Sequence, residues 1–110
     1  MDQFIVTTTP NVPGHRITKV LGIVCGITAR TRGIGGKIIS GIQSMLGGEV
    51  SAFTEEMIKA RDEALKRAID QAKSLGANAI IGLDFETSEV FESVVMVSVT
   101  GTAVIVTPET

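Results

Sequence analysis

The stretch TEEMIKARDEALKRAIDQAKSL, residues Thr54–Leu75, carries the clearest structural signal in the chain and constrains how the rest must fold. Thr54 is a residue type that caps helix N-termini, acidic residues follow it in the first turn, and Gly76 supplies a stop. Apolar residues recur at spacings of three and four, which is the helical period. The stretch therefore predicts a helix of about six turns.

Alanine occupies every fourth position along the apolar face of this predicted helix, at Ala60, Ala64, Ala68 and Ala72. Small side chains in a row allow a helix to lie close against its neighbour. We therefore expect the buried face of the helix to make near contact with a sheet.

Upstream of the helix, the sequence predicts a short strand at Phe4–Thr9 and a long one at Arg16–Thr31. The odd positions of the long strand are mostly apolar, which predicts that Cys25 is buried. Gly22 and Gly26 interrupt the strand and are expected to mark bulges or bends.

Downstream of the helix, apolar and polar residues alternate from Ala79 to Phe85, which predicts a strand with one face exposed to solvent. A turn is expected around Ser88–Ser93. The last predicted strand, Val94–Val106, carries apolar residues at both odd and even positions. This strand is therefore expected to be covered on both sides.

A short, glycine-rich helix is predicted between Arg32 and Gly48. Together these elements predict a single α+β domain, residues 1–110, with a small mixed sheet of about four strands, one long helix and one short helix. A sheet has two faces, and one long helix covers only one of them. We expect a second copy of the chain to cover the other face; the alternative is that the Ile34–Leu46 segment covers it alone.

Composition narrows the class of protein. The 110 residues are 44% hydrophobic and carry a formal charge of −2, without a lysine or arginine run. This balance argues against nucleic-acid binding, and the lack of a long apolar run argues against a membrane span. A single cysteine permits no intramolecular disulfide, in agreement with a reducing compartment. We expect a soluble, cytoplasmic protein.

The stretch Arg30–Lys37 combines glycines with three cations, and Arg30, Arg32 and Lys37 are the candidate residues for an anion site. The stretch lacks the glycine spacing of a phosphate loop and of a dinucleotide fingerprint, so a surface loop is the favoured interpretation. The carboxylates lie on faces that are predicted to be exposed to solvent, and the sequence shows no general base beside a candidate nucleophile. We predict no catalytic residue and no cofactor, and an enzyme is the less favoured class.

Soft metal ions need several thiolates or imidazoles converging on one centre. The chain has one histidine, His15, and one cysteine, Cys25. A single subunit cannot build such a site from them, so we predict no metal ligand and interpret them as a loop histidine and a buried thiol.

Several motifs, in this order along nearly the whole chain, resemble the YbjQ family: IVTTT at residues 5–9, the glycine-punctuated strand ending at Ala29–Arg30, the pair Gly47–Gly48, ARDEA at residues 60–64, GANAIIG at 76–82 and VTGTAV at 99–104. This is a family of small, largely uncharacterised bacterial and archaeal proteins, which are often labelled as heavy-metal-binding. The resemblance implies a mixed subunit assembled into a ring-like homo-oligomer, a pentamer, without an established reaction.

The functional expectation is therefore a homo-oligomeric structural or small-ligand-binding protein, whose partners are copies of itself and a small ligand or ion. One alternative is a heavy-metal-binding protein that uses ligands from several subunits. A further alternative is an enzyme with an anion-binding loop.

Overall fold

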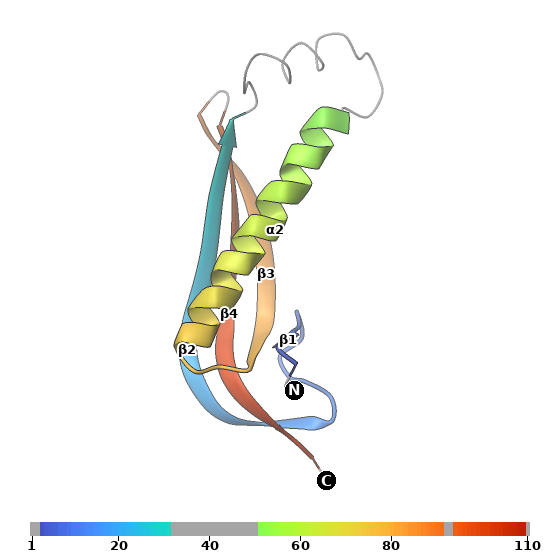
Figure 1. Cartoon of the computed structure of the whole chain (residues 1–110), viewed down its shortest axis with the longest axis vertical. Coiled ribbons are helices and arrows are strands. Elements are labelled where there is room, and N and C mark those ends of the chain that lie inside the picture. Colours follow the sequence, from blue (N-terminus) through green and yellow to red (C-terminus); the bar gives the residue numbers. More distant parts are fainter. Residues whose placement is uncertain (1–2, 32–50, 92–93, 110) are drawn as a thin grey trace.

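The computed structural model describes residues 3–31, 51–91 and 94–109. Its elements are β1 (Ile5–Val6), β2 (His15–Thr31), α2 (Ser51–Ser74), β3 (Ala79–Phe91) and β4 (Val94–Pro108) (Figure 1). The helix predicted between Arg32 and Gly48 lies outside the described residues.

The strands form a four-stranded mixed sheet in the order β1-β3-β4-β2, as the α+β prediction required. The long strands β2 and β3 both pair antiparallel to the central strand β4. The short strand β1 pairs parallel to β3 through Ile5 and Val6 only. Most of the N-terminal segment predicted as a strand is therefore irregular, and β2 forms one edge of the sheet.

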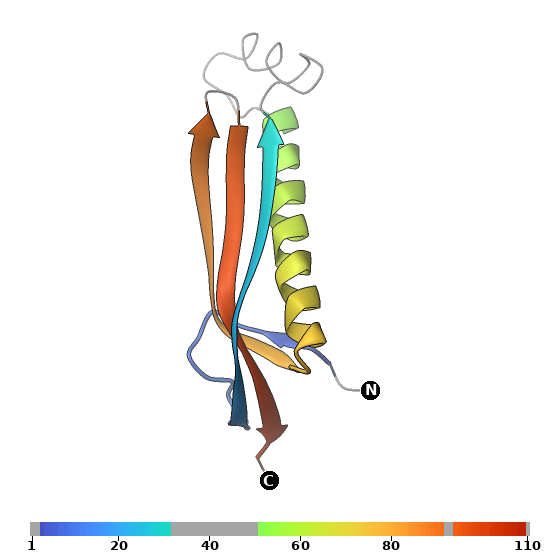
Figure 2. The ribbon, with the colours of Figure 1, turned by 90° about the vertical axis from the view of Figure 1, so that its left-hand side faces the viewer.

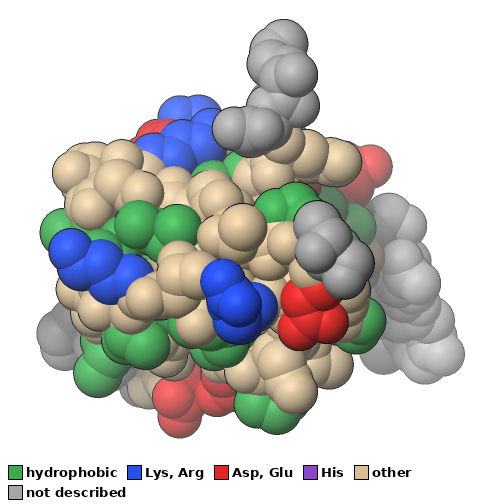
Figure 3. Space-filling view, turned by 90° about the horizontal axis from the view of Figure 1, so that it is seen from below, with side chains coloured by type: hydrophobic (Ala, Val, Ile, Leu, Met, Phe, Trp, Pro, Cys, Tyr) green, Lys and Arg blue, Asp and Glu red, His purple; other side chains and the backbone are tan. Residues whose placement is uncertain are grey.

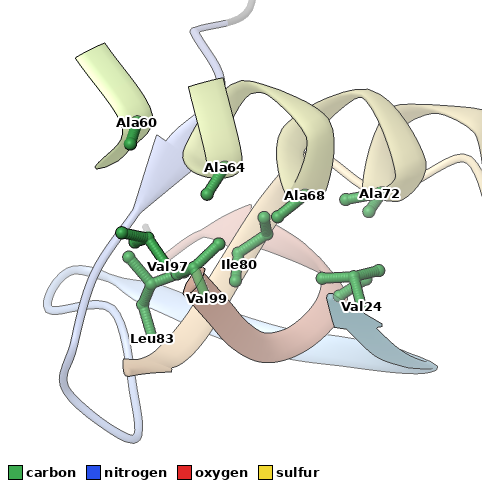
Figure 4. Packing of buried hydrophobic residues seen from close by; sticks show 11 residues of the cluster. Val24, Ala60, Ala64, Ala68, Ala72, Ile80, Leu83, Val97 and Val99 are labelled. Carbon is green, nitrogen blue, oxygen red and sulfur yellow. The ribbon is translucent and has the colours of Figure 1, made fainter. Parts of the chain in front are cut away.

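The helix α2 lies along one face of the sheet, chiefly over β2 and β4 (Figures 1 and 2). All four alanines of the predicted row are fully buried. Figure 4 shows them pointing at Val24, Ile80, Val97 and Val99 on the strands. The alanine row therefore forms the contact that the sequence predicts.

The two glycines of β2 play different roles. The pairing of β2 with β4 shifts register between Val20 and Gly22, and Gly22 has a φ of 140°, so the predicted bulge at Gly22 is confirmed. At Gly26 the pairing is uninterrupted, and the prediction of a bulge there is wrong. Gly26 is instead the point where the backbone of α2 approaches β2, because a Cβ at this position would meet backbone atoms of Ala64 and Ala68.

The buried face of β2 is the opposite of the predicted one. Val24, Gly26 and Thr28 face α2 and are buried, whereas Ile23 and Ile27 lie on the other face with 81% and 48% of their surface exposed. Cys25 shares that face and is half-buried rather than buried. The physical reason is that close approach of α2 needs a small residue at position 26 and a bonding partner at Thr28, which outweighs the apolar count of the odd positions.

Among residues 3–31, 51–91 and 94–109, the cover on the face of the sheet away from α2 lies near the chain ends. There a second cluster of Val12, Ala79, Val104 and Val106 is buried, with Ile5 and Ile17 packed against it. This cluster gives the C-terminal half of β4 the two-sided cover that its sequence predicts. Further along the same face, Met96 and Ser98 are half-buried and Thr100 is exposed.

The prediction of a turn around Ser88–Ser93 places its start too early, because β3 continues to Phe91. Thr87, Ser88 and Glu89 still pair with β4, opposite Val97, Met96 and Val95. Pairing with β4 thus extends the strand past residues whose own types favour a turn. The resulting strands are long, and a 24-residue helix of about 36 Å cannot cover a 17-residue strand of about 56 Å.

Candidate functional site

The uncovered face of β2 presents a column of apolar side chains, here called the β2 apolar strip: Val20, Ile23, Cys25 and Ile27. Val20, Ile23 and Ile27 are 64%, 81% and 48% exposed. The strip follows an edge strand of the sheet, the one that lies beside α2 in Figure 2. Exposed large apolar residues gathered in one column are characteristic of a surface that another molecule covers.

The character of this face changes across the sheet. The strand pairing sets Thr102, Thr100 and Ser98 of β4 beside Ile23, Cys25 and Ile27. Asp84 and Glu86 of β3 pair with Thr100 and Ser98 on the far side. The face therefore runs from apolar at β2, through hydroxyl-bearing at β4, to acidic at β3.

Side chains of α2 occupy part of the outer edge of β2. The backbone N–H of Cys25 donates a hydrogen bond to Oε1 of Gln71 at 2.8 Å. Arg67 donates from Nη1 to the carbonyl oxygen of Ile27 at 2.5 Å. Both backbone groups point away from β4, where a further strand would otherwise bind them, so the helix blocks strand addition along this segment.

Arg30, one of the three predicted anion-site residues, is bound by carboxylates of α2. Its Nη2 donates to Oε2 of Glu63 at 2.8 Å, and its Nη1 lies 3.7 Å from Oε2 of Glu56. Two acidic partners offset much of the positive charge that an anion would need. Arg32 and Lys37 lie outside the described residues, so the anion site stays a prediction.

His15 and Cys25 do not come together. They lie ten residues apart on one strand, a separation of about 33 Å at the usual strand rise. The His15 Nδ1 is 3.1 Å from the carbonyl oxygen of Pro13. Among the residues that the structure describes, no group of three or more His, Cys, Asp or Glu side chains is arranged to hold a metal ion.

A groove of about 360 Å³ opens between the N-terminal half of α2 and the strands β3 and β4. Its lining consists of Thr54, Met57, Ile58, Arg61, Phe85, Thr87 and Val97. The guanidinium carbon of Arg61 lies 4.4 Å from the centroid of the Phe85 ring, a cation–π distance.

This groove was not predicted from the sequence. A signal for it was present, because the residues four before and four after Arg61 are Met57 and Leu65. Neither residue offers the carboxylate that can pair with a cation four positions away on a helix. Arg61 therefore lies between apolar residues on its own side of the helix.

Charge is mixed on the end of the molecule where the chain termini lie. Figure 3 shows basic, acidic and hydrophobic side chains interspersed there, without a large area of one sign. Within the described ranges, no helix is long and apolar enough to cross a membrane.

A family model described as "Putative heavy-metal-binding" matches residues 4–107. The relatives include a UPF0145 protein of Methanoregula boonei, 45% identical over 109 residues that cover 99% of this chain and 91% of the relative. Others are a UPF0145 protein of Picrophilus torridus, 42% identical and covering 98% and 92%, and one of Saccharolobus islandicus, 46% identical and covering 91% and 88%.

Among solved structures, a protein of unknown function of the DUF74 family from Pediococcus pentosaceus matches with a TM-score of 0.63. The match covers 94% of this chain and 98% of that chain at 20% identity, so it bears on the fold alone. The relatives carry no described activity in their names, and the resemblance found in the sequence motifs is confirmed. The chain belongs to the YbjQ family, also named UPF0145.

Proposed function

We propose that the chain is a subunit of a cytoplasmic homo-oligomeric ring that binds a small ligand or ion where copies meet. The observation that carries this proposal is the β2 apolar strip, in which Ile23 is 81% exposed. Burial of one such side chain stabilises an assembly by about 1.5–3 kcal/mol. The family resemblance suggests a pentamer, and the lone cysteine agrees with a reducing compartment.

Charge supports contact between different sides of neighbouring copies. Strand β3 pairs with β1 at Ala79 and Ile80 and carries Asp84 and Glu86 beyond that pairing, whereas the start of β2, on the other side of β4, carries Arg16 and Lys19. Unlike edges that attract each other produce a heterologous contact, and repeated heterologous contacts close into a ring. The face away from α2 then turns inward, where apolar strips of neighbouring copies cover one another.

The bonds from Gln71 and Arg67 limit how the copies join. They occupy the edge groups of Cys25 and Ile27, so a neighbouring strand cannot continue the ladder at that point. Contact through the strip's side chains remains open there. We therefore propose that side-chain packing on this face, and not backbone pairing at Cys25–Ile27, holds this part of the assembly.

Light scattering on a size-exclusion peak tests the proposal. The native protein is expected to elute at a multiple of 11.6 kDa, and Ile23→Lys is expected to shift it toward the monomer with unchanged circular dichroism. Ile58→Lys is the matched control, because Ile58 is also exposed but lies on α2. A native 11.6 kDa monomer at micromolar concentration would end the proposal.

A second candidate is metal binding by several subunits, which the position of Cys25 favours. Cys25 lies half-buried on the uncovered face between two exposed isoleucines, so an assembly that covers this face would bring copies of the thiol toward each other. Convergent thiolates suit soft metal ions. Calorimetric titration with zinc, copper and nickel should then give heat that Cys25→Ser abolishes; absence of heat from the native protein would exclude this candidate.

A further inference from the structure

We propose that the groove between α2 and β3 binds a small monocarboxylate with an apolar body, such as an aryl or short alkyl acid. The lining residues belong to α2, β3 and β4 of one chain. The site is therefore complete without a second copy, and the proposal does not depend on the ring.

The groove results from the way α2 is placed on the sheet. The alanine row and Gly26 draw the helix close over β2, while α2 touches β3 only slightly. Of the described part of the chain, no helix lies over the inner face of β3 near Phe85. Met57 and Ile58 form one wall and Phe85 and Val97 the other, and Ile58 is 54% exposed.

Arg61 supplies a positive charge at this apolar lining. Three other cations of α2 face carboxylates: Lys59 lies 3.7 Å from Glu56, Lys66 3.0 Å from Asp70, and Arg67 2.6 Å from Glu63. Lys73, in the last turn of α2, lies 5.6 Å from the centroid of the Phe4 ring and does not line the groove. Arg61 has no salt bridge to any carboxylate among the described residues and instead lies over the Phe85 ring. A guanidinium held at an apolar groove without an acidic partner offers a bidentate site for a carboxylate.

The size and polarity of the groove define the class of ligand. Its volume of about 360 Å³ is near the lower end of the range for small-molecule sites, about 300–1,000 Å³. Thr54 and Thr87 add two hydroxyl groups to the one cation. One cation and two hydroxyls match a singly charged carboxylate, whereas a phosphate with two charges would require more donors.

Binding of naphthoate and of naphthylmethanol, its uncharged counterpart, tests the proposal. Methyl resonances of Met57, Ile58 and Val97 are expected to shift saturably with naphthoate, and at least about tenfold more alcohol should be needed for the same shift. Arg61→Gln should weaken naphthoate binding about tenfold and leave the alcohol unaffected, while Arg61→Lys should retain part of the preference for the acid. Lys66→Gln, which removes an ion-paired cation of the same helix, should change neither.

Equal binding of acid and alcohol, or naphthoate binding that survives Arg61→Gln unchanged, would overturn the proposal. A groove covered by a second copy would overturn it too, and its methyl resonances would then shift with protein concentration and not with naphthoate. Repeating the titration with Ile23→Lys separates this site from the ring, because the groove contains no residue of the β2 apolar strip.

Discussion

Gly26 of β2 lies directly beneath the carbonyl oxygen of Ala64 on α2, and a Cβ added at position 26 would overlap that oxygen. The next atoms it would meet are the backbone nitrogen of Ala68 at 2.8 Å and the carbonyl carbon of Ala64 at 2.9 Å. These are backbone atoms, which cannot rotate away as a flexible side chain can. One glycine and the alanine row therefore set the distance between helix and sheet together.

Gly26→Ala is expected to lower the free energy of unfolding by about 1–3 kcal/mol, because the added methyl group must push α2 away from β2. The sign is diagnostic, since alanine within a strand is otherwise favoured over glycine by about 0.5–1 kcal/mol. Urea denaturation measures the change. Adding Ala64→Gly should not restore stability, because the overlap involves the carbonyl oxygen and not the alanine methyl; a stable Gly26→Ala protein would contradict this account of the contact.

The side chain of Asn78, which directly precedes β3, makes the two hydrogen bonds to Val106 of β4 that the backbone of a neighbouring strand would otherwise make. Its Nδ2 donates to the carbonyl oxygen of Val106 at 2.9 Å, and its Oδ1 accepts from the Val106 N–H at 2.8 Å. Asn78→Ala leaves the N–H and the carbonyl oxygen of the buried Val106 without these partners. We therefore expect the free energy of unfolding to fall by about 1–3 kcal/mol, measured by thermal or urea denaturation. Asn78→Asp keeps the acceptor oxygen and loses the N–H donor. Its stability should therefore fall between that of the native protein and that of Asn78→Ala.

The helix and the long strand β2 could be predicted from the sequence because their signals are local. The alanine row and Gly76 indicate a helix at this position whatever lies beside it. The prediction that Thr54 caps the helix is wrong, because α2 begins at Ser51 and Thr54 lies within it. The two-sided character of β4 was also visible, since Val104 and Val106 fall at even positions and Val97 and Val99 at odd ones.

The buried face of β2 could not be predicted from apolar counts, because the contact with α2 depends on size and bonding. Gly26 adds nothing to hydrophobicity but admits the helix backbone, and Thr28 is polar yet 3% exposed because it donates to Glu63. The groove was missed for a similar reason. Whether Phe85 lies beneath α2 or beside it depends on the position of the helix across the sheet, which no periodicity specifies.

Removal of the Gln71 side chain should expose one edge group of β2. The Cys25 N–H donates to Gln71 Oε1 at 2.8 Å, so Gln71→Ala should accelerate hydrogen exchange at the Cys25 amide and lower stability by about 0.5–1.5 kcal/mol. Gln71→Glu retains an acceptor oxygen and should preserve the protection. If both variants leave exchange at Cys25 as it is in the native protein, the edge is protected by something other than this bond.

Glu63 joins three partners from two elements. Its Oε1 accepts from Thr28 Oγ1 at 3.0 Å and from Arg67 at 2.6 Å, and its Oε2 accepts from Arg30 at 2.8 Å. The Glu63 side chain is 37% exposed, so solvent screens these bonds, and we expect Glu63→Gln to cost about 1 kcal/mol at low salt.

Asp70→Asn removes a single exposed helical pair with Lys66 and provides the control, with an expected cost of about 0.2–0.5 kcal/mol. Urea unfolding at low and high salt measures both changes, and the effect of Glu63→Gln should shrink as salt screens the charges. The larger cost at position 63 follows from its two arginine partners, Arg30 of β2 and Arg67 of α2, whereas Gln retains an oxygen that can accept from Thr28. Equal costs for the two variants would mean that Glu63 contributes no more than a pair within one helix, and that Arg30 does not depend on its charge.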